Sequence, residues 1–293
     1  MCLFQVLAQQ TELDNKSIGY LGFDYASNTN TFGVTVNEVK QPSFLFSGSY
    51  LSKYNFDLNY SYFLTDNADS NYSKPAEEHN LGLGYNLQLT ERISIYPSYT
   101  HLIHSKNSYA LKSIFNDIAQ TDLFYNTNYY SSALTLSYLW GQNNMFYGSW
   151  YNAAEITFEK FLHPKAMLNL QLGMGINYSD NNYYNKVLYD NWGYEDFTSW
   201  IRQNYPRRAE ILIERIGIEG FDIIKNYIYT QNESLFTPDY TFTTLDFMLP
   251  AYYYLNDISF SFTVYLHMPI SENALYEQYT SLMFMAGIGY IIQ

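Results

Sequence analysis

The residues best suited to chemistry in this sequence are His104 and Ser105, which stand next to each other ahead of Lys106 and Asn107. Nucleophilic catalysis needs an imidazole that activates a hydroxyl, an orienting carboxylate or amide, and an oxyanion donor. Neighbouring residues on a strand point to opposite faces, so His104 and Ser105 are poorly placed as partners. We therefore predict no catalytic residue and a protein that is not an enzyme. Hydrolysis of a membrane lipid is the remaining enzymatic alternative.

No other pattern of reactive residues indicates a metal or cofactor site. The five histidines show no ligand spacing with acids or thiols, and the single cysteine is Cys2. Gly82 and Gly84, like Gly173 and Gly175, lack the context of a phosphate-binding loop, and we interpret them as small residues on strands that face an interior. The sequence predicts neither a cofactor nor a bound metal.

Long segments alternate apolar and polar residues with a period of two, which indicates strands. In 55–62, for example, Phe56, Leu58 and Tyr60 alternate with asparagine, aspartate and serine. The runs keep phase for about 8 to 12 residues, whereas soluble strands average about 5 or 6 and about 9–11 residues cross a bilayer at a tilt. The predicted strands are 17–26, 43–52, 54–65, 79–90, 92–104, 108–124, 128–140, 145–162, 166–178, 240–253, 256–268 and 278–292.

The joints between these strands are short and long in turn, which is typical of barrels with short periplasmic turns, long external loops and periplasmic termini. Unpaired backbone groups are costly in hydrocarbon, so such a sheet has to close. We predict an all-β fold, a closed antiparallel transmembrane β-barrel of about 12 strands, with a partly helical extracellular insertion. The short joints are Lys53, 90–91, the Asn126 region, 163–165 and 256–257, and the long ones are 27–42, 66–78, 179–239 and 269–277. Two joints on the external side, near Lys106 and at 141–144, are short as well.

Composition excludes several protein classes. The 28 acidic residues outnumber the 15 basic ones, and the resulting net charge of −13 argues against a nucleic-acid partner. Aromatic residues make up 19% of the chain, which is too many for a disordered protein. The 33 tyrosines suit the headgroup level of a membrane, where a ring with a hydroxyl forms an interfacial girdle. A soluble β-sandwich is the alternative, but it explains so many long strands with one apolar face poorly.

The first residues end an apolar run on small residues, as the tail of a signal peptide does, with Val6 and Ala8 before the cleavage point. We predict that 1–8 is a residual signal peptide and that 9–293 is a single barrel domain. A retained strand-like N-terminus is the alternative. Export of a chain without disulfides indicates a bacterial envelope.

The last strand carries a resemblance to a known class. With Ser281 to Gln293, the export leader and the alternating strands, the chain resembles bacterial outer-membrane β-barrel proteins. In that class the last strand usually ends in an aromatic residue that the barrel-assembly machinery reads, and here Tyr290 precedes Gln293 by three positions. Pro250 to Phe262 is similar to the penultimate hairpin of small barrels known mainly as domains of unknown function. The resemblance implies a Gram-negative outer membrane, contact with its lipid, and the assembly machinery as a partner during biogenesis.

Residues 179–239 do not alternate and contain two predicted helices, 194–205 and 207–229, broken at Pro206 and loosened at Gly217 and Gly220. Residues 210–218 fit an extra strand as well. We expect this segment to fold as a cap that plugs the pore or docks on another envelope protein. The candidate residues for these roles are Trp200, Arg207, Arg208, Ile216 and Phe221.

If the apolar residues face lipid, their neighbours line an acidic interior that favours cations and neutral polar solutes. We predict a narrow porin-like channel for small polar or cationic solutes, gated by 179–239. A non-conducting structural or adaptor subunit is the second hypothesis, and the lipid hydrolase is the third. The predicted lumen-lining residues are Asp24, Asp57, Arg92, Glu155, Glu159, Asp246, Tyr96, Tyr147, Tyr151 and Tyr265.

Overall fold

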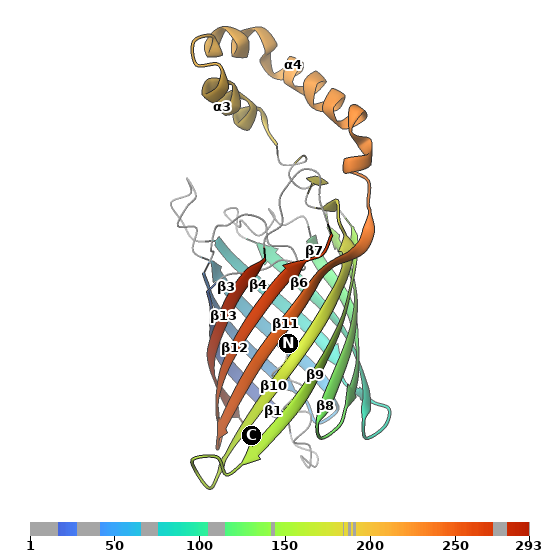
Figure 1. Cartoon of the computed structure of the whole chain (residues 1–293), viewed down its shortest axis with the longest axis vertical. Coiled ribbons are helices and arrows are strands. Elements are labelled where there is room, and N and C mark those ends of the chain that lie inside the picture. The colour runs from blue at the N-terminus through green and yellow to red at the C-terminus, as the bar shows by residue number, and fades with distance from the viewer. Residues whose placement is uncertain are drawn as a thin grey trace.

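The computed structural model describes residues 17–27, 42–65, 76–104, 115–141, 144–183, 185–186, 189, 192–271 and 280–292. Its main body is one antiparallel sheet that closes into a barrel (Figure 1). Consecutive strands pair with each other, and the first strand pairs with the last. The strand β4 and the two-residue β5 share one position because both pair with β6, so the thirteen described strands make a wall of twelve positions. The predicted fold class is confirmed.

The strand bounds follow the predicted alternation closely. The strands are β1 Ile18–Ala26, β2 Ser43–Leu51, β3 Phe56–Thr65, β4 Ala76–Tyr85, β5 Leu87–Gln88, β6 Ile93–His104, β7 Phe115–Asn126, β8 Tyr130–Gly141, β9 Met145–Glu159, β10 Ala166–Asp180, β11 Tyr240–Leu255, β12 Ile258–Pro269 and β13 Ser281–Ile292.

One predicted strand, 79–90, is interrupted at Asn86. The Asn86 N–H donates to the backbone oxygen of Asn55 at 2.9 Å, so this residue bonds to the neighbouring turn and leaves a break between β4 and β5. The start predicted at residue 108 for the sixth strand lies outside the described residues, among which β7 begins at Phe115.

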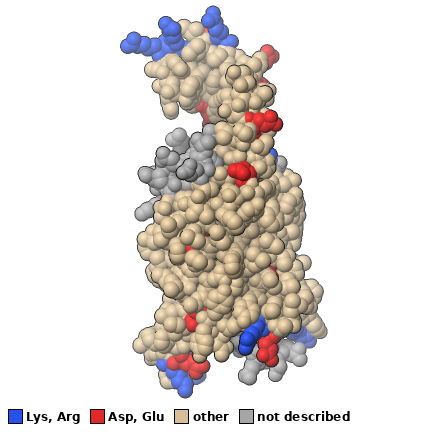
Figure 2. All heavy atoms as spheres, turned by 45° about the vertical axis from the view of Figure 1, so that its right-hand side comes forward, with Lys and Arg blue, Asp and Glu red and all other residues tan. Residues whose placement is uncertain are grey.

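Burial alternates along the strands as the sequence pattern requires. On β8, Ala133, Thr135 and Ser137 are buried, while Leu134 and Leu136 are exposed. The small and polar residues therefore face the interior, and the large apolar ones face outward. Figure 2 shows one face of the resulting exterior, which is nearly free of charge between charged groups at the two ends of the molecule.

The predicted short turns at 53, 90–91, the Asn126 region, 163–165 and 256–257 all lie at one end of the barrel, whereas the short joint between Gly141 of β8 and Met145 of β9 lies at the other. Ile18 pairs with Leu51, and Gly19 pairs with Ile292, so β1 begins and β13 ends at the same end as the predicted short turns. Asn55 and Asn256 adopt left-handed φ values of 66° and 52°, a conformation that asparagine tolerates well in tight turns. The predicted short turns at 53, 90–91, 163–165 and 256–257 are present.

The insertion is helical, as predicted. It contains α3 Tyr194–Asn204, α4 Ala209–Gln231 and the 3₁₀ turn η2 Glu233–Leu235, and α3 and α4 stand beyond the barrel rim (Figure 1). Gly217 interrupts α4 with φ 58° and ψ −175°. The alternative of a strand at 210–218 is wrong, because these residues pack a helical face against α3. None of the helices described is long and apolar enough to cross a membrane.

Candidate functional site

The barrel interior carries a set of carboxylates that come from separate strands. Asp57, Asp122 and Asp246 are 2%, 1% and 4% exposed, and each has the inward phase of its strand. Glu155 on β9 is buried as well, and Asp24 on β1 is half-buried. Asp122 is absent from the sequence-based set. The sequence does indicate its position, because Gln120 and Asp122 alternate with Leu123 and Tyr125, which are exposed. The irregular start of that segment obscured this alternation.

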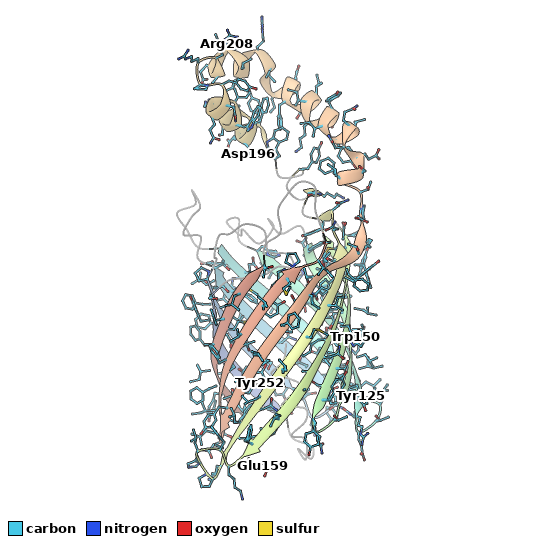
Figure 3. The ribbon with its side chains drawn as sticks, in the orientation of Figure 1. Tyr125, Trp150, Glu159, Asp196, Arg208 and Tyr252 are labelled. Atoms are coloured by element: carbon cyan, nitrogen blue, oxygen red, sulfur yellow. The ribbon has the colours of Figure 1, made fainter. Side chains whose placement is uncertain are left out.

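Two residues predicted to line the lumen lie at its end instead. Arg92 belongs to the turn before β6 and is exposed, because the Thr90 hydroxyl oxygen accepts from the backbone N–H groups of Arg92 and Ile93 and fixes the turn. Arg92 therefore does not oppose the buried acids. Glu159 ends β9 and is exposed at the end of the barrel remote from the helices (Figure 3).

Inward tyrosines fill much of the interior. The Tyr96 ring lies over Gly84 on the next strand, and the Tyr151 ring lies over Gly173, so that a Cβ atom on either glycine would overlap the tyrosine hydroxyl. The inward position of these glycines agrees with the sequence interpretation. Tyr96, Tyr151, Tyr147 and Tyr265 all have the predicted inward phase. The rings serve as packing, which leaves less of their faces for a solute.

A buried polar network joins four strands toward the end of the barrel that carries the insertion. His267 Nδ1 lies 2.8 Å from Asp246 Oδ1, and Asn177 Nδ2 donates to Asp246 Oδ2 at 2.6 Å. Asn177 also donates to Thr244 Oγ1 at 2.7 Å and accepts from the Tyr147 hydroxyl at 2.7 Å. Both carboxylate oxygens of Asp246 thus have partners, so this network holds the wall together and offers no free acceptor from that carboxylate.

A cavity of about 500 Å³ lies inside the barrel and extends from Asn86 and Asn126 near the short turns to Leu45 and Phe63 toward the other end. Its lining comes from β1, β2, β3, β4, β6 and β7 and includes three acids, Asp24, Asp57 and Asp122. The Tyr96 hydroxyl donates to Asp57 across the cavity wall. Apolar side chains, among them Leu45 and Phe63, complete the lining. The cavity is therefore acidic on one part of its surface and apolar on another.

The opposite end of the interior is filled by apolar side chains. Leu139, Met145 and Phe115 are 0%, 1% and 3% exposed, and they pack with Tyr183 from the first residues of the insertion. The Tyr183 ring stacks on Phe115 with centroids 5.2 Å apart. The insertion thus contributes to the filling through Tyr183 at its base, while α3 and α4 lie beyond the rim (Figure 1).

The insertion residues predicted to plug the pore or dock on a partner differ in position, since some are buried in the cap and others are exposed. Phe221 is 4% exposed and Ile216 packs beside it in the core between α3 and α4, so both build the cap and neither presents a docking surface. This corrects their proposed role, because the two helices bury Phe197, Ile201 and Phe221 against one another. Trp200, Arg207 and Arg208 are exposed, and Arg208 lies at the far end of the cap (Figure 3).

Solved structures with low sequence identity resemble this chain in fold. LpxR from Salmonella typhimurium matches with a TM-score of 0.50 and 8% identity, over 92% of this chain and 99% of its own. A KdgM porin matches with 0.49 and 8%, over 94% and 99%, and a NanC porin with 0.47 and 7%, over 93% and 98%. Family models and curated proteins give no match by sequence. Identities this low bear on the fold alone.

The chain has the fold of bacterial outer-membrane β-barrel proteins. The exterior of this barrel agrees with a membrane environment. Near the insertion, the outward rings of Tyr138 and Trp140 stack with centroids 6.0 Å apart. Near the short turns, the Tyr125 and Tyr130 rings lie 6.4 Å apart. Aromatic side chains thus occur toward both ends of the wall, as in the two interfacial girdles of membrane barrels.

The surroundings of His104 bear on the hydrolase alternative. His104 has the inward phase, its Nε2 lies 3.1 Å from the backbone oxygen of Phe115, and its Nδ1 lies 3.7 Å from Glu78 Oε1. The ring is thus engaged by a carbonyl and faces a carboxylate, whereas Ser105 lies outside the described residues. Within the described ranges, no group of three or more His, Cys, Asp or Glu side chains is arranged to hold a metal ion.

Proposed function

We propose that this outer-membrane barrel is a narrow channel that favours small cationic or neutral polar solutes. The observation that carries the proposal is the imbalance of charge inside the wall. Asp57, Asp122, Glu155 and Asp246 are buried with inward phase, and none of the described strands contains a lysine or arginine. A low-dielectric wall focuses such a negative field, which raises the local concentration of cations and repels anions.

The channel is gated by the base of the insertion. Tyr183 is 5% exposed and packs on the apolar cluster at the outer end of the interior. A hydrophobic constriction excludes water until it opens, and ions do not pass a dewetted segment. A wall of twelve strands is also narrower than that of porins with 16 to 18 strands. Displacement of one aromatic side chain would therefore change conduction.

Planar-bilayer recordings in a KCl gradient test the channel. We expect a reversal potential that indicates cation selectivity. The double substitution Asp57→Asn and Asp122→Asn should move this potential toward zero. Tyr183→Ala should raise the conductance, because it removes the insertion's ring from the apolar cluster. Tyr189→Ala is the matched control, since that ring packs on Tyr229 and Phe236 within the insertion. Anion selectivity, or silence from both the intact chain and a chain lacking 182–236, would overturn the channel.

We further propose that the short turns and both termini are periplasmic and that the cap is external. Lys53 lies in a short turn, and Arg208 lies at the far end of the cap. In a Cys2→Ser background, Arg208→Cys should react with a membrane-impermeant maleimide on intact cells. Lys53→Cys should react only after the outer membrane is permeabilised. The reverse labelling pattern would refute this orientation.

A structural or adaptor subunit is the second candidate, favoured by apolar side chains on the surface of α4. Ile211, Ile218 and Ile223 are 66%, 62% and 70% exposed, and exposed apolar patches mark interaction sites. A stoichiometric partner that copurifies with the native protein, and is lost when the three isoleucines become serine, would support the adaptor. Copurification that survives the triple substitution would count against docking through α4.

A further inference from the structure

The acidic cavity contains a carboxylate with unused hydrogen-bonding capacity. Asp57 is 2% exposed, and its Oδ2 accepts from the Tyr96 hydroxyl and from Asn59 Nδ2. Its Oδ1 is buried and has no hydrogen-bond partner in the structure. Asp122 in the same cavity differs, because Thr135 and Gln120 donate to its two oxygens. Within this pair of acids, Asp57 is thus the one that lacks a donor.

Three other polar atoms in the lining share this condition. Asn80 Oδ1, Asn126 Oδ1 and Ser49 Oγ are buried without a hydrogen-bond partner, and all three residues line the cavity that Asp57 lines. The carboxylate and amide oxygens can only accept hydrogen bonds. Buried polar groups in folded proteins are normally satisfied, so several unfilled acceptors around one cavity indicate a donor that occupies it.

The rest of the lining restricts the chemistry of that donor. The carboxylates call for a positive charge, which a neutral sugar lacks, and the apolar part of the lining calls for a hydrocarbon group, which a metal ion lacks. Leu45, Phe63 and Phe124 supply an apolar wall that suits a hydrocarbon chain. A volume of about 500 Å³ is in the range of sites for small organic molecules.

We propose that this cavity binds an aliphatic primary amine or diamine, with an ammonium group that donates to Asp57 and a methylene chain along Leu45, Phe63 and Phe124. The proposal deepens the channel function, on which it rests, by naming the class of solute. An ammonium group supplies both the missing donors and the charge that compensates the carboxylate, and such charge-assisted hydrogen bonds are the stronger kind.

Isothermal titration of the full chain in detergent micelles with putrescine tests the site. We expect saturable binding, no binding of glucose under the same conditions, and at least about ten-fold weaker binding in Asp57→Asn, as the loss of a hydrogen bond to a charged group predicts. Glu155→Gln removes the same charge from a lumen position outside the cavity lining, and its affinity should change less than about three-fold. Asn80→Ala keeps the charge and removes one acceptor, and it should weaken binding even if Asp57→Asn does not fold.

The outcomes separate this proposal from the channel itself. Absence of putrescine binding, or equal losses in Asp57→Asn and Glu155→Gln, would overturn the amine site, and the latter result would assign the effect to the overall lumen charge. Conductance without amine binding would leave the channel and remove the site. Amine binding without conductance in any variant would leave the site and remove the channel.

Discussion

At the scale of single residues, several polar side chains inside this barrel are paired with partners on other strands. Asp246 is 4% exposed, yet both its oxygens have partners, one in His267 and one in Asn177. A buried carboxylate left without a partner would be costly, because it loses hydration and gains nothing in return. The pair formed by Asp246 and His267 is therefore expected to contribute to stability more than a similar pair on the surface.

The substitution His267→Ala tests this difference. Removal of one partner from a buried pair costs about 3–5 kcal/mol, so the free energy of unfolding in urea should fall by roughly that amount. His101→Ala is the matched control, since His101 lies 2.8 Å from Asp117 in an equivalent pair but is 46% exposed. An exposed pair contributes far less to stability than a buried one, because water screens it. Equal losses of unfolding free energy in the two variants would show that burial does not determine how much such a pair contributes to stability.

The glycines beneath the tyrosines allow a second prediction at this scale. A Cβ atom at Gly173 would overlap the Tyr151 hydroxyl, so Gly173→Ala should displace that ring and cost about 1–3 kcal/mol of unfolding free energy. A Cβ atom at Gly148 would lie 3.7 Å from Leu136 Cδ2, which is ordinary contact. Gly148→Ala should be close to neutral in the same urea titration. A stable Gly173→Ala barrel would mean that Tyr151 can move without loss.

At the scale of elements, α4 owes its bend to a single residue. Gly217 has φ 58° and ψ −175° and nothing lies within 4 Å of the position where a Cβ would stand, so the obstacle to a side chain is backbone conformation and not space. That region of φ and ψ is essentially restricted to glycine, and other residues held there cost about 1–3 kcal/mol. The bend changes the direction of α4, and side chains from the parts before and after Gly217 both pack in the core with α3.

Gly217→Ala should therefore loosen the packing of α4 on α3 while the barrel stays intact. We expect faster hydrogen exchange in 194–231 and an unchanged exchange rate in β8 and β10. Glu219→Ala is the control, because Glu219 is exposed in the same helix. Equal exchange in the two variants would show that the left-handed conformation at Gly217 is not needed by the cap.

At the scale of the whole molecule, the cap has a core of its own. Phe197, Ile201, Ala209 and Phe221 are buried against one another, and the partly buried side chains around them also belong to the insertion. The wall is instead stabilised by its strand pairing and closure. The two parts should unfold separately, as cooperative units with few shared contacts do.

Replacement of 194–231 by a short glycine-serine linker tests this independence. The linker keeps Tyr183 and the apolar cluster it joins, so the free energy of barrel unfolding should change by no more than about 0.5 kcal/mol. Conductance of this variant should match that of the intact chain, in contrast to Tyr183→Ala. A large loss of barrel stability would show that the cap supports the wall.

Much of this architecture follows from local pattern. The period of two in segments such as 55–62 and 168–178 predicts strands, their faces and the closed barrel, because side chains on successive strand residues must point to opposite sides. The same reasoning places Asp57, Glu155 and Asp246 inside. It misplaced Arg92, since one hydroxyl contact in a turn decides where β6 begins.

The sequence by itself therefore determined the strands, their lipid-facing sides, the acidic interior and the two helices of the insertion, all of which depend on residues close together along the chain. The tertiary structure alone decided which side chains meet across strands. Tyr183 on Phe115, Tyr96 on Asp57 and the unfilled acceptors around the cavity bring together residues that are distant in sequence. The closure of the barrel and the register of its strands determine these contacts, and no local periodicity encodes them.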